Sequence, residues 1–193
     1  CCLVGSEMCI RDRMAPDPTM ETYILAIASF RRGDLGDALA RMDELTATYP
    51  DDAFFHEFKG DILFAMARPA EAAASFETAL QLRPGSVLIQ LNLGRSLIAE
   101  GGPASLGRAI QVLAMARSAE SQWGLLHRQY GIALGKAGRI VEADLALADE
   151  AIVINDKQRA AQLARRVLAR DGVAENFRSR ASDILFRYGG QAD

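Results

Sequence analysis

Two histidines are the side chains of this 193-residue sequence best suited to bind a metal ion, and one of them begins a near-match to a zinc motif. The string His56-Glu57-Phe58-Lys59-Gly60 starts like HExxH, in which two histidines one helical turn apart bind the same Zn²⁺. Gly60 stands where the second histidine is needed. His127 lies four residues before Gly131, just as His56 lies four before Gly60. The repeated position therefore predicts two packing histidines and no metal site.

Acidic pairs are the other side chains that could do acid–base chemistry, and each has a simpler interpretation. The pairs Asp51-Asp52 and Asp43-Glu44 fall at turn or surface positions, and Asp149-Glu150 falls on what the pattern predicts to be a solvated helix face. The sequence contains no glycine-rich phosphate loop and no GxSxG nucleophile motif. It therefore predicts neither catalytic residues nor a cofactor within this chain.

The three cysteines, Cys1, Cys2 and Cys9, all lie in the first nine residues. They come without a histidine or a second cysteine cluster, so their spacing does not predict a zinc site. The opening also lacks the basic segment and unbroken apolar stretch of a signal peptide. Residues 6–13, SEMCIRDR, resemble a translated sequencing adapter. We therefore expect residues 1–18 to be an artefactual or disordered segment outside the fold.

Composition predicts a helical globular chain. Apolar residues make up 50% and charged residues 24%, with a net charge of -3 and a pI near 5.5. This balance lacks the excess of basic residues that is typical of a nucleic-acid-binding protein, so we expect no nucleic-acid partner. The apolar run around residues 23–30 is far shorter than the roughly 18 residues that a membrane helix needs. Alanine is abundant while valine and threonine are scarce, which favours helix over strand.

A spacing of 34 residues organises the chain. It separates Pro50 from Pro84 and Gly60 from Gly94, and Gly131 follows 37 residues after Gly94. This is the tetratricopeptide (TPR) period, in which small residues let two helices approach, a large apolar residue fills the gap and proline ends the second helix. The alternative is a generic alanine-rich helical bundle. The positions predicted to carry the packing are Gly60, Ala72, Phe76, Ala79, Pro84, Gly94, Ala109, Gly131 and Ala143.

The predicted fold class is all-α, a TPR-type α-solenoid of antiparallel helix hairpins. Turn signals and apolar periodicity predict helices at residues 19–32, 35–48, 53–66, 69–82, 87–100, 104–118, 122–136, 139–153, from about 157 to 170, and 174–188. The three extra residues of the third unit are expected in a loop at 101–103. One domain, 19–188, thus holds about four repeats, a half repeat and a capping helix with Phe177, Ile184, Leu185 and Phe186 on its apolar face; residues 189–193 form a tail.

The first helix of each hairpin lines the concave groove of a solenoid, and solenoid proteins bind their partners in this groove. The lysine and asparagine that clamp a C-terminal carboxylate in chaperone-binding repeats are absent from the corresponding positions, which argues against a chaperone-tail adaptor. Trp123, which opens the fourth hairpin, is expected in the core. The candidate protein-binding residues in the groove are Tyr23, Ile27, Glu57, Asp61, Leu91, Arg95, Arg128 and Ile132.

Several stretches resemble the C-terminal TPR domain of a bacterial zinc metallopeptidase family. They are residues 49–64, 68–72, 91–97, 143–151 and 180–185. The family is related to the CAAX-prenyl and HtpX proteases and is of the periplasmic, beta-barrel-assembly-enhancing type. The resemblance covers nearly all of residues 19–188, and only the TPR half of such a protease.

The resemblance implies a protein–protein interaction module of a zinc-dependent metalloprotease that acts in outer-membrane protein quality control. Zinc belongs to the catalytic half, and no catalytic or zinc-binding residue of the family maps onto this sequence. The implied partners are the protease domain itself and outer-membrane proteins or their assembly machinery, with peripheral membrane association through the parent. The implied location is the periplasm. The alternative is a free-standing cytoplasmic TPR adaptor with no enzymatic parent.

Overall fold

The structure is a computed structural model that describes residues 17–190. The three cysteines and the adapter-like string at 6–13 lie outside the described residues, as does most of the segment predicted to stand apart from the fold. No statement about their structure follows.

Ten α-helices make up the described part of the chain, and no strand occurs in it. Each helix begins and ends within two residues of its predicted bounds, which confirms the all-α class. The helices are α2 (Pro18–Arg32), α3 (Leu35–Thr48), α4 (Ala53–Ala65), α5 (Pro69–Leu82), α6 (Val87–Glu100), α7 (Pro103–Ala119), α8 (Gly124–Lys136), α9 (Ile140–Val153), α10 (Lys157–Leu168) and α11 (Glu175–Tyr188).

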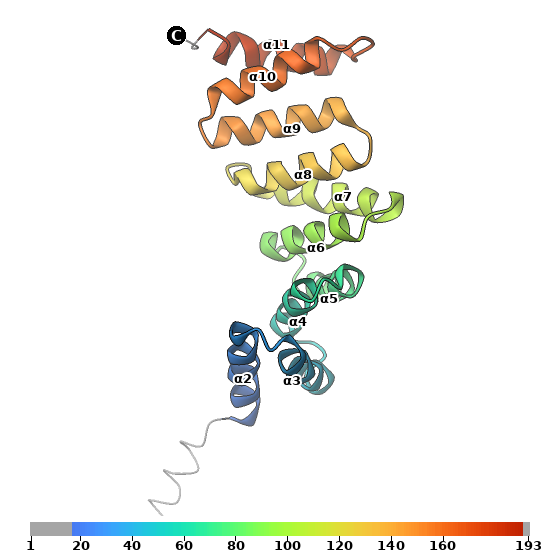
Figure 1. Ribbon diagram of the computed structural model, residues 1–193, viewed down its shortest axis with the longest axis vertical. Coiled ribbons are helices and arrows are strands. Elements are labelled where there is room, and N and C mark those ends of the chain that lie inside the picture. The colour runs from blue at the N-terminus through green and yellow to red at the C-terminus, as the bar shows by residue number, and fades with distance from the viewer. Residues whose placement is uncertain (1–16, 191–193) are drawn as a thin grey trace, which may run out of the picture.

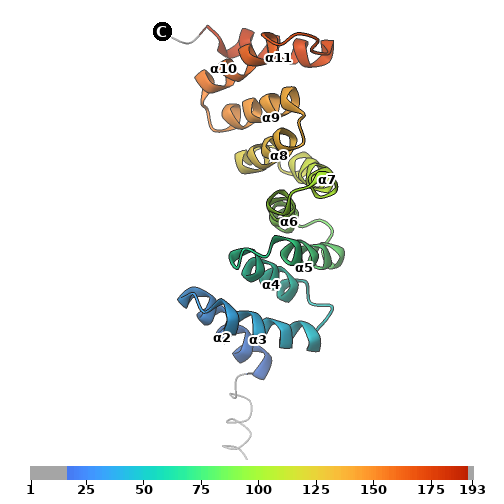
Figure 2. The same ribbon diagram turned by 45° about the vertical axis from the view of Figure 1, so that its right-hand side comes forward.

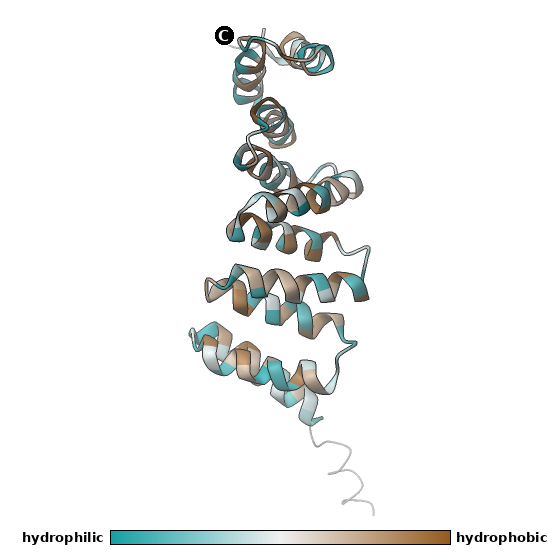
Figure 3. Ribbon diagram, turned by 90° about the vertical axis from the view of Figure 1, so that its right-hand side faces the viewer, coloured by the Kyte–Doolittle hydropathy of each residue, from teal (hydrophilic) through white to brown (hydrophobic). Residues whose placement is uncertain are grey.

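The helices stack in sequence order into an elongated solenoid. Figures 1 and 2 show the chain rising from α2 at one end to α11 at the other, with each helix beside its neighbours in sequence. Five hairpins result, α2–α3, α4–α5, α6–α7, α8–α9 and α10–α11. Apolar and polar residues alternate along every helix (Figure 3), because each helix buries one face between its neighbours and leaves the other in solvent.

Local sequence explains where the helices begin. The carboxylates of Asp17, Asp34, Asp52 and Asp156 accept hydrogen bonds from backbone N–H groups in the first turns of α2, α3, α4 and α10. These caps satisfy donors that have no partner inside the helix. Asp52 therefore acts as a helix cap, and its pairing with Asp51 in the sequence reflects a turn.

Close contact between a glycine and a large apolar side chain joins the two helices of the three central hairpins. A Cβ atom added at Gly60 would lie 2.8 Å from the Phe76 ring, and one added at Gly94 would lie 2.6 Å from Leu113. Gly131 faces Leu147 at 2.9 Å in the same way. The other packing positions carry buried alanines, namely Ala72, Ala79, Ala109 and Ala143. The 34-residue period thus coincides with positions at which only a very small side chain fits.

The extra residues of the third unit do not form the loop that was expected at 101–103. Helices α6 and α7 are joined by Gly101 and Gly102 alone, and α7 begins at Pro103. Helix α7 has 17 residues where α5 has 14, so the insertion is an additional helical turn before Ala109. Both glycines have positive φ, 78° and 82°, which allows so short a connection.

Two aromatic residues depart from their predicted place in the core. Phe186 on α11 is 95% exposed, although Phe177, Ile184 and Leu185 do pack against the last core cluster. Phe186 follows Leu185 directly, and adjacent helical residues point to different faces, so only one of the two can face α10. Trp123 is 37% exposed because it precedes the first turn of α8 and lies in the α7–α8 connection.

Candidate protein-binding face

The first helices of the hairpins, α2, α4, α6, α8 and α10, form what we call the first-helix face. Seven of the eight predicted groove residues are at least partly exposed on it. The exception is Leu91, which is 2% exposed and belongs to the main core cluster. Leu91 is therefore a core residue and not a groove residue.

Three of the predicted residues, Tyr23, Glu57 and Asp61, line one hollow of about 390 Å³ between α2, α4 and the start of α6. We call it the α4 hollow, because α4 contributes half of its lining residues, more than any other element. Its other lining residues are Phe54, Phe58, Arg83, Ser86 and Leu88. Apolar rings and aliphatic side chains thus surround two carboxylates.

Aromatic contacts hold the α2 wall of the α4 hollow in place. Tyr23 packs edge-on against Phe58 with ring centroids 5.8 Å apart, and it contacts Phe55 at 5.5 Å. Phe30 meets the other side of Phe58 at 5.5 Å. Such tilted and edge-to-face pairs are favourable geometries for aromatic rings. The hollow therefore has a wall fixed by contacts between two hairpins.

The carboxylates of the α4 hollow are poorly compensated. Burial and, to a smaller extent, the charge of Glu57 raise the pKa of Asp61 to about 6, and Arg95 only partly opposes both effects. Burial also raises the pKa of Glu57, which Arg83 partly offsets, and the pKa of Tyr23. Two acidic groups that repel one another in a partly dry site favour a cation between or above them.

The direct partners of Asp61 come from α6. Asn92 donates a hydrogen bond from Nδ2 to Asp61 Oδ1 at 3.3 Å, and Arg95 donates to Asn92 Oδ1 at 3.2 Å. The guanidinium of Arg95 also stacks over the Phe64 ring at 5.0 Å, while that of Arg83 stacks over Phe54 at 4.6 Å. Neither arginine makes an ion pair with Glu57 or Asp61 within the described residues, so the acidic character of the hollow persists.

Three other predicted groove residues, Arg128, Ile132 and Ile27, do not line the α4 hollow. Arg128 donates from Nε to Glu150 at 2.6 Å, so its charge serves the contact between α8 and α9. Ile132 is exposed on α8, and Ile27 is partly buried on α2; neither lines the α4 hollow. The eight predicted positions therefore make one local site around α4 and several separate surface positions.

Helix α9 corrects the prediction that Asp149 and Glu150 form a solvated face. Glu150 is 1% exposed and pairs with Arg128 and Arg159, while Asp149 pairs with Arg180 and lies near Arg117. Asp144, 1% exposed, pairs with Arg166 of α10 and with Arg170, which follows that helix. An internal helix of a solenoid has neighbours on several sides, so polar residues on its flanks become buried.

The side chain of each of the two histidines forms a hydrogen bond with the backbone of the preceding turn. His56 shares a hydrogen bond of 2.8 Å between Nε2 and the Pro50 carbonyl, and His127 does the same with Ser121. At the equivalent position of the repeat between them, Gln90 donates from Nε2 to the Pro84 carbonyl at 3.2 Å. Each side chain thus ties the first helix of a hairpin to the turn six residues earlier, beyond the packing role that was predicted.

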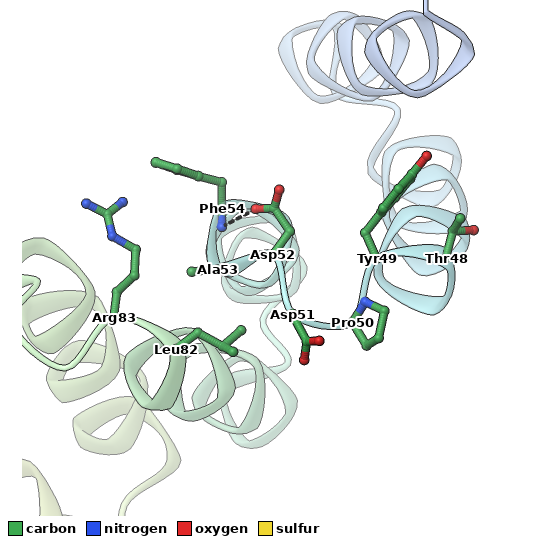
Figure 4. A pocket seen from close by; sticks show the side chains of 9 residues that line it. All are labelled: Thr48, Tyr49, Pro50, Asp51, Asp52, Ala53, Phe54, Leu82 and Arg83. Carbon is green, nitrogen blue, oxygen red and sulfur yellow. Dashed lines mark hydrogen bonds between the residues drawn. The ribbon is translucent and has the colours of Figure 1, made fainter.

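A second hollow, of about 560 Å³, opens at the α3–α4 turn beside the end of α5 (Figure 4). Its acidic residues are Asp51 and Asp52, and the Asp52 carboxylate already accepts a hydrogen bond from the Phe54 N–H at 2.9 Å. Its lining consists of turn and helix-end residues; Asp51 is exposed, and the stacked pair Arg83 and Phe54 belongs to the α4 hollow as well. The α4 hollow is therefore the better candidate for recognition.

Sequence reasoning missed several residues of the α4 hollow, namely Phe54, Phe58, Arg83 and Leu88. Phe54 and Phe58 lie one turn apart on α4 beside Glu57, and this spacing is the signal that could have found them. Arg83 lies in the α5–α6 connection and Leu88 in the first turn of α6. The prediction considered only positions in the middle of the first helices, so it did not include these two residues.

Two further properties concern the part of the chain that the structure describes. Over residues 17–190, no group of three or more His, Cys, Asp or Glu side chains could hold a metal ion. None of the helices described here has both the length and the apolar character needed to span a bilayer.

The tetratricopeptide repeat family model matches residues 23–87 and 59–122, together just over half of the chain. The chain therefore belongs to the tetratricopeptide repeat family. Such repeats stack into extended surfaces that bind other proteins, and the chain is a protein–protein interaction module.

Solved structures share this fold. MamA 41-end from Desulfovibrio magneticus RS-1 has a TM-score of 0.67 at 16% identity, covering 93% of this chain and 100% of that one. YrrB, described as a TPR protein with an unusual peptide-binding site, has a TM-score of 0.64 at 18% identity, over 88% and 93% of the two chains. The type IV pilus biogenesis factor PilW has a TM-score of 0.51 at 17% identity, over 92% and 89%. At these identities the likeness concerns the fold alone. No match was found among curated protein sequences.

Proposed function

We propose that the first-helix face binds an extended segment of a partner protein, and that the α4 hollow receives a basic side chain of that segment. The observation that carries the proposal is the pair Glu57 and Asp61, held in a partly buried hollow without an ion-pair partner among the described residues. A lysine or arginine between these carboxylates would relieve their repulsion, and the rings of Tyr23 and Phe58 would contact its aliphatic stem.

The fold neighbours are consistent with this kind of ligand. YrrB is described as having a peptide-binding site, and it matches most of this chain at the level of the fold. An extended peptide can contact successive first helices of a solenoid, so one basic residue in the hollow leaves flanking residues free to contact α2 and α6.

Selection from a random-peptide display library tests the proposal. The wild-type chain should enrich peptides that share a Lys or Arg beside an apolar residue. The double variant Glu57→Gln, Asp61→Asn should lose that enrichment, because the lining of the hollow then has no negative charge. The matched control Glu44→Gln, Asp51→Asn makes the same charge change away from the first-helix face and should retain it. Equal enrichment by both double variants would rule the hollow out.

We further propose that this module belongs to a periplasmic zinc metalloprotease of the beta-barrel-assembly-enhancing type. The support is the resemblance of residues 49–64, 143–151 and 180–185 to the TPR domains of that family. The zinc ion would be bound by the protease domain, and the partners would be that domain, outer-membrane proteins or their assembly machinery.

The contiguous gene sequence upstream of the codon for Met14 tests the parentage. An in-frame HExxH-containing domain would support it and would also identify residues 6–13 as adapter-derived. A ribosome-binding site and start codon next to Met14 would instead identify a free-standing TPR adaptor. The peptide selection above does not depend on which of these is found.

A further inference from the structure

A third hollow, of about 380 Å³, lies between α7, α9, α11 and the start of α8, and it shares no lining residue with the α4 hollow. Second helices of three hairpins, α7, α9 and α11, contribute Arg117, Asp149 and Arg180 to its lining. The start of α8 adds His127, and the α7–α8 turn adds Ser121. No part of the proposed peptide site lies among these residues.

The two arginines of this hollow retain unused hydrogen-bond donors. Arg180 contacts Asp149 through Nη2 alone, at 2.6 and 2.7 Å from the two carboxylate oxygens. Arg117 reaches Asp149 only at 3.6 Å from Nη1, and its guanidinium stacks over the Tyr130 ring at 4.3 Å. A guanidinium group has five N–H donors, and within residues 17–190 Arg117 makes no hydrogen bond with any of them. Two positive charges therefore face one negative charge.

His127 provides an independent sign of a missing ligand. It is 7% exposed, and its Nδ1 atom has no hydrogen-bond partner among the described residues. A backbone carbonyl can only accept, so the bond between Nε2 and the Ser121 carbonyl puts the ring proton on Nε2. Nδ1 of the neutral ring is then a buried acceptor without a donor, and the Asp149 carboxylate 3.9 Å away has no proton to give.

We propose that this hollow binds a phosphate group. Phosphate oxygens accept hydrogen bonds from the free donors of Arg117 and Arg180, a planar-donor chemistry that suits oxyanions. The remaining P–OH of a monoprotonated phosphate donates to His127 Nδ1. A ligand of this kind satisfies the excess positive charge and the buried acceptor together, whereas a fully ionised sulfate satisfies only the former.

Titration of the ¹⁵N-labelled chain with inorganic phosphate, at constant ionic strength and near neutral pH, tests the proposal. Amide resonances of Arg117, Ser118 and His127 should shift and saturate, while those around His56 should not move. Sulfate should bind at least roughly tenfold more weakly, because it lacks the proton that Nδ1 requires. Equal binding of the two anions, or shifts that grow without saturating, would overturn the proposal.

The variant His127→Phe removes the Nδ1 acceptor and keeps an aromatic ring at this position. It also loses the hydrogen bond to the Ser121 carbonyl, so the matched control is His56→Phe, which loses the corresponding bond to the Pro50 carbonyl outside the hollow. Both variants should lose stability, and only His127→Phe should reduce the phosphate affinity to that of sulfate. Arg117→Gln should also weaken phosphate binding roughly tenfold, and Arg108→Gln, on the same helix but outside the hollow, should not. Phosphate affinity unaffected by either His127→Phe or Arg117→Gln would contradict the assignment.

O-phosphoserine identifies the source of the phosphate, with its affinity calculated for the monoprotonated species because the second pKa of a phosphate monoester is about 6. If it binds more tightly than inorganic phosphate, at the same resonances, the hollow takes a phosphate monoester of a partner. Equal or weaker binding of O-phosphoserine assigns the hollow to free phosphate. Failure of both to bind refutes the site and leaves the peptide-binding proposal for the first-helix face untouched.

Discussion

Two sets of buried or partly buried carboxylates in this solenoid are treated in opposite ways. On α9, Asp144, Asp149 and Glu150 are each paired with arginines that come from α7, α8, α10 and α11. On α4, Glu57 makes no ion pair within the described residues, and Asp61 receives only one long hydrogen bond from Asn92. The chain thus uses the acidic residues of α9 to join helices and leaves those of the α4 hollow available.

The difference separates stability from recognition. On α9, an arginine already offsets the charge of each carboxylate, so these carboxylates have little to offer a cationic ligand. The carboxylates of the α4 hollow raise the free energy of the unliganded fold, which a cationic partner can recover on binding. Residues that the fold does not need to pair are the ones through which an otherwise generic repeat can select a partner.

The largest loss of stability is expected when the buried carboxylate of Glu150 loses its arginine partners. The double variant Arg128→Gln, Arg159→Gln leaves Glu150 buried without a counter-ion. We expect a loss of about 3 kcal/mol in the free energy of unfolding, at the low end for a broken buried pair because both arginines are half-exposed. Urea denaturation measures it. Adding Glu150→Gln should recover most of the loss, and a double variant as stable as the wild type would show that α9 does not depend on these pairs.

A smaller effect tests the packing that both halves share. Gly60→Leu places a side chain where a Cβ atom alone would lie 2.8 Å from Phe76. We expect destabilisation of about 1–3 kcal/mol by overpacking, measured as a shift of the urea midpoint. Gly107→Ala is the matched control, because a Cβ atom at Gly107 in α7 meets nothing within 4 Å. That change should stabilise by roughly 0.5–1 kcal/mol through helix propensity. Similar losses in both variants would contradict the repeat frame.

The smallest expected effect is the pH dependence of stability that Asp61, a carboxylate without an ion pair, produces. Because the pKa of Asp61 is raised to about 6 in the folded chain, the folded state binds more protons than the unfolded state above the ordinary pKa of 3.8. The contribution of Asp61 to stability therefore falls as the pH rises from about 4 to about 6, and is constant above that range. Asp61→Asn should be more favourable relative to wild type at pH 7.5 than at pH 4.5. A stability difference independent of pH would mean that Asp61 is fully compensated.

The sequence predicts the helices and their packing well because both depend on local and periodic signals. Gly60 and Gly94 lie 34 residues apart at equivalent positions of the repeat. Each meets a large apolar residue of the following helix, Phe76 in one case and, after the extra turn of α7, Leu113 in the other. The additional turn of α7 was mistaken for a loop because Gly101-Gly102-Pro103 is typical of a turn, whereas Pro103 is also a good first residue of a helix.

The candidate site was predictable only in part. Tyr23, Glu57 and Asp61 follow from the repeat frame, but their meeting with Arg83 and Leu88 depends on how two hairpins stack. The burial of Glu150 depends on arginines 22 residues earlier and nine residues later in the chain, and no local pattern encodes that pairing. Leu91 was misplaced for the same reason, because helix rotation decides which apolar residue faces the core.

The central claim is that a basic peptide segment is recognised by α2, α4 and α6 and not by the ion-paired carboxylates of α9. A Lys- or Arg-containing peptide recovered by selection, titrated into the ¹⁵N-labelled chain, tests it most directly. Amide shifts should concentrate around Tyr23, Glu57, Asp61 and Leu88, and Glu57→Gln, Asp61→Asn should weaken binding at least roughly tenfold. Shifts centred on α8–α10, or an affinity that the double variant leaves unchanged, would contradict the account.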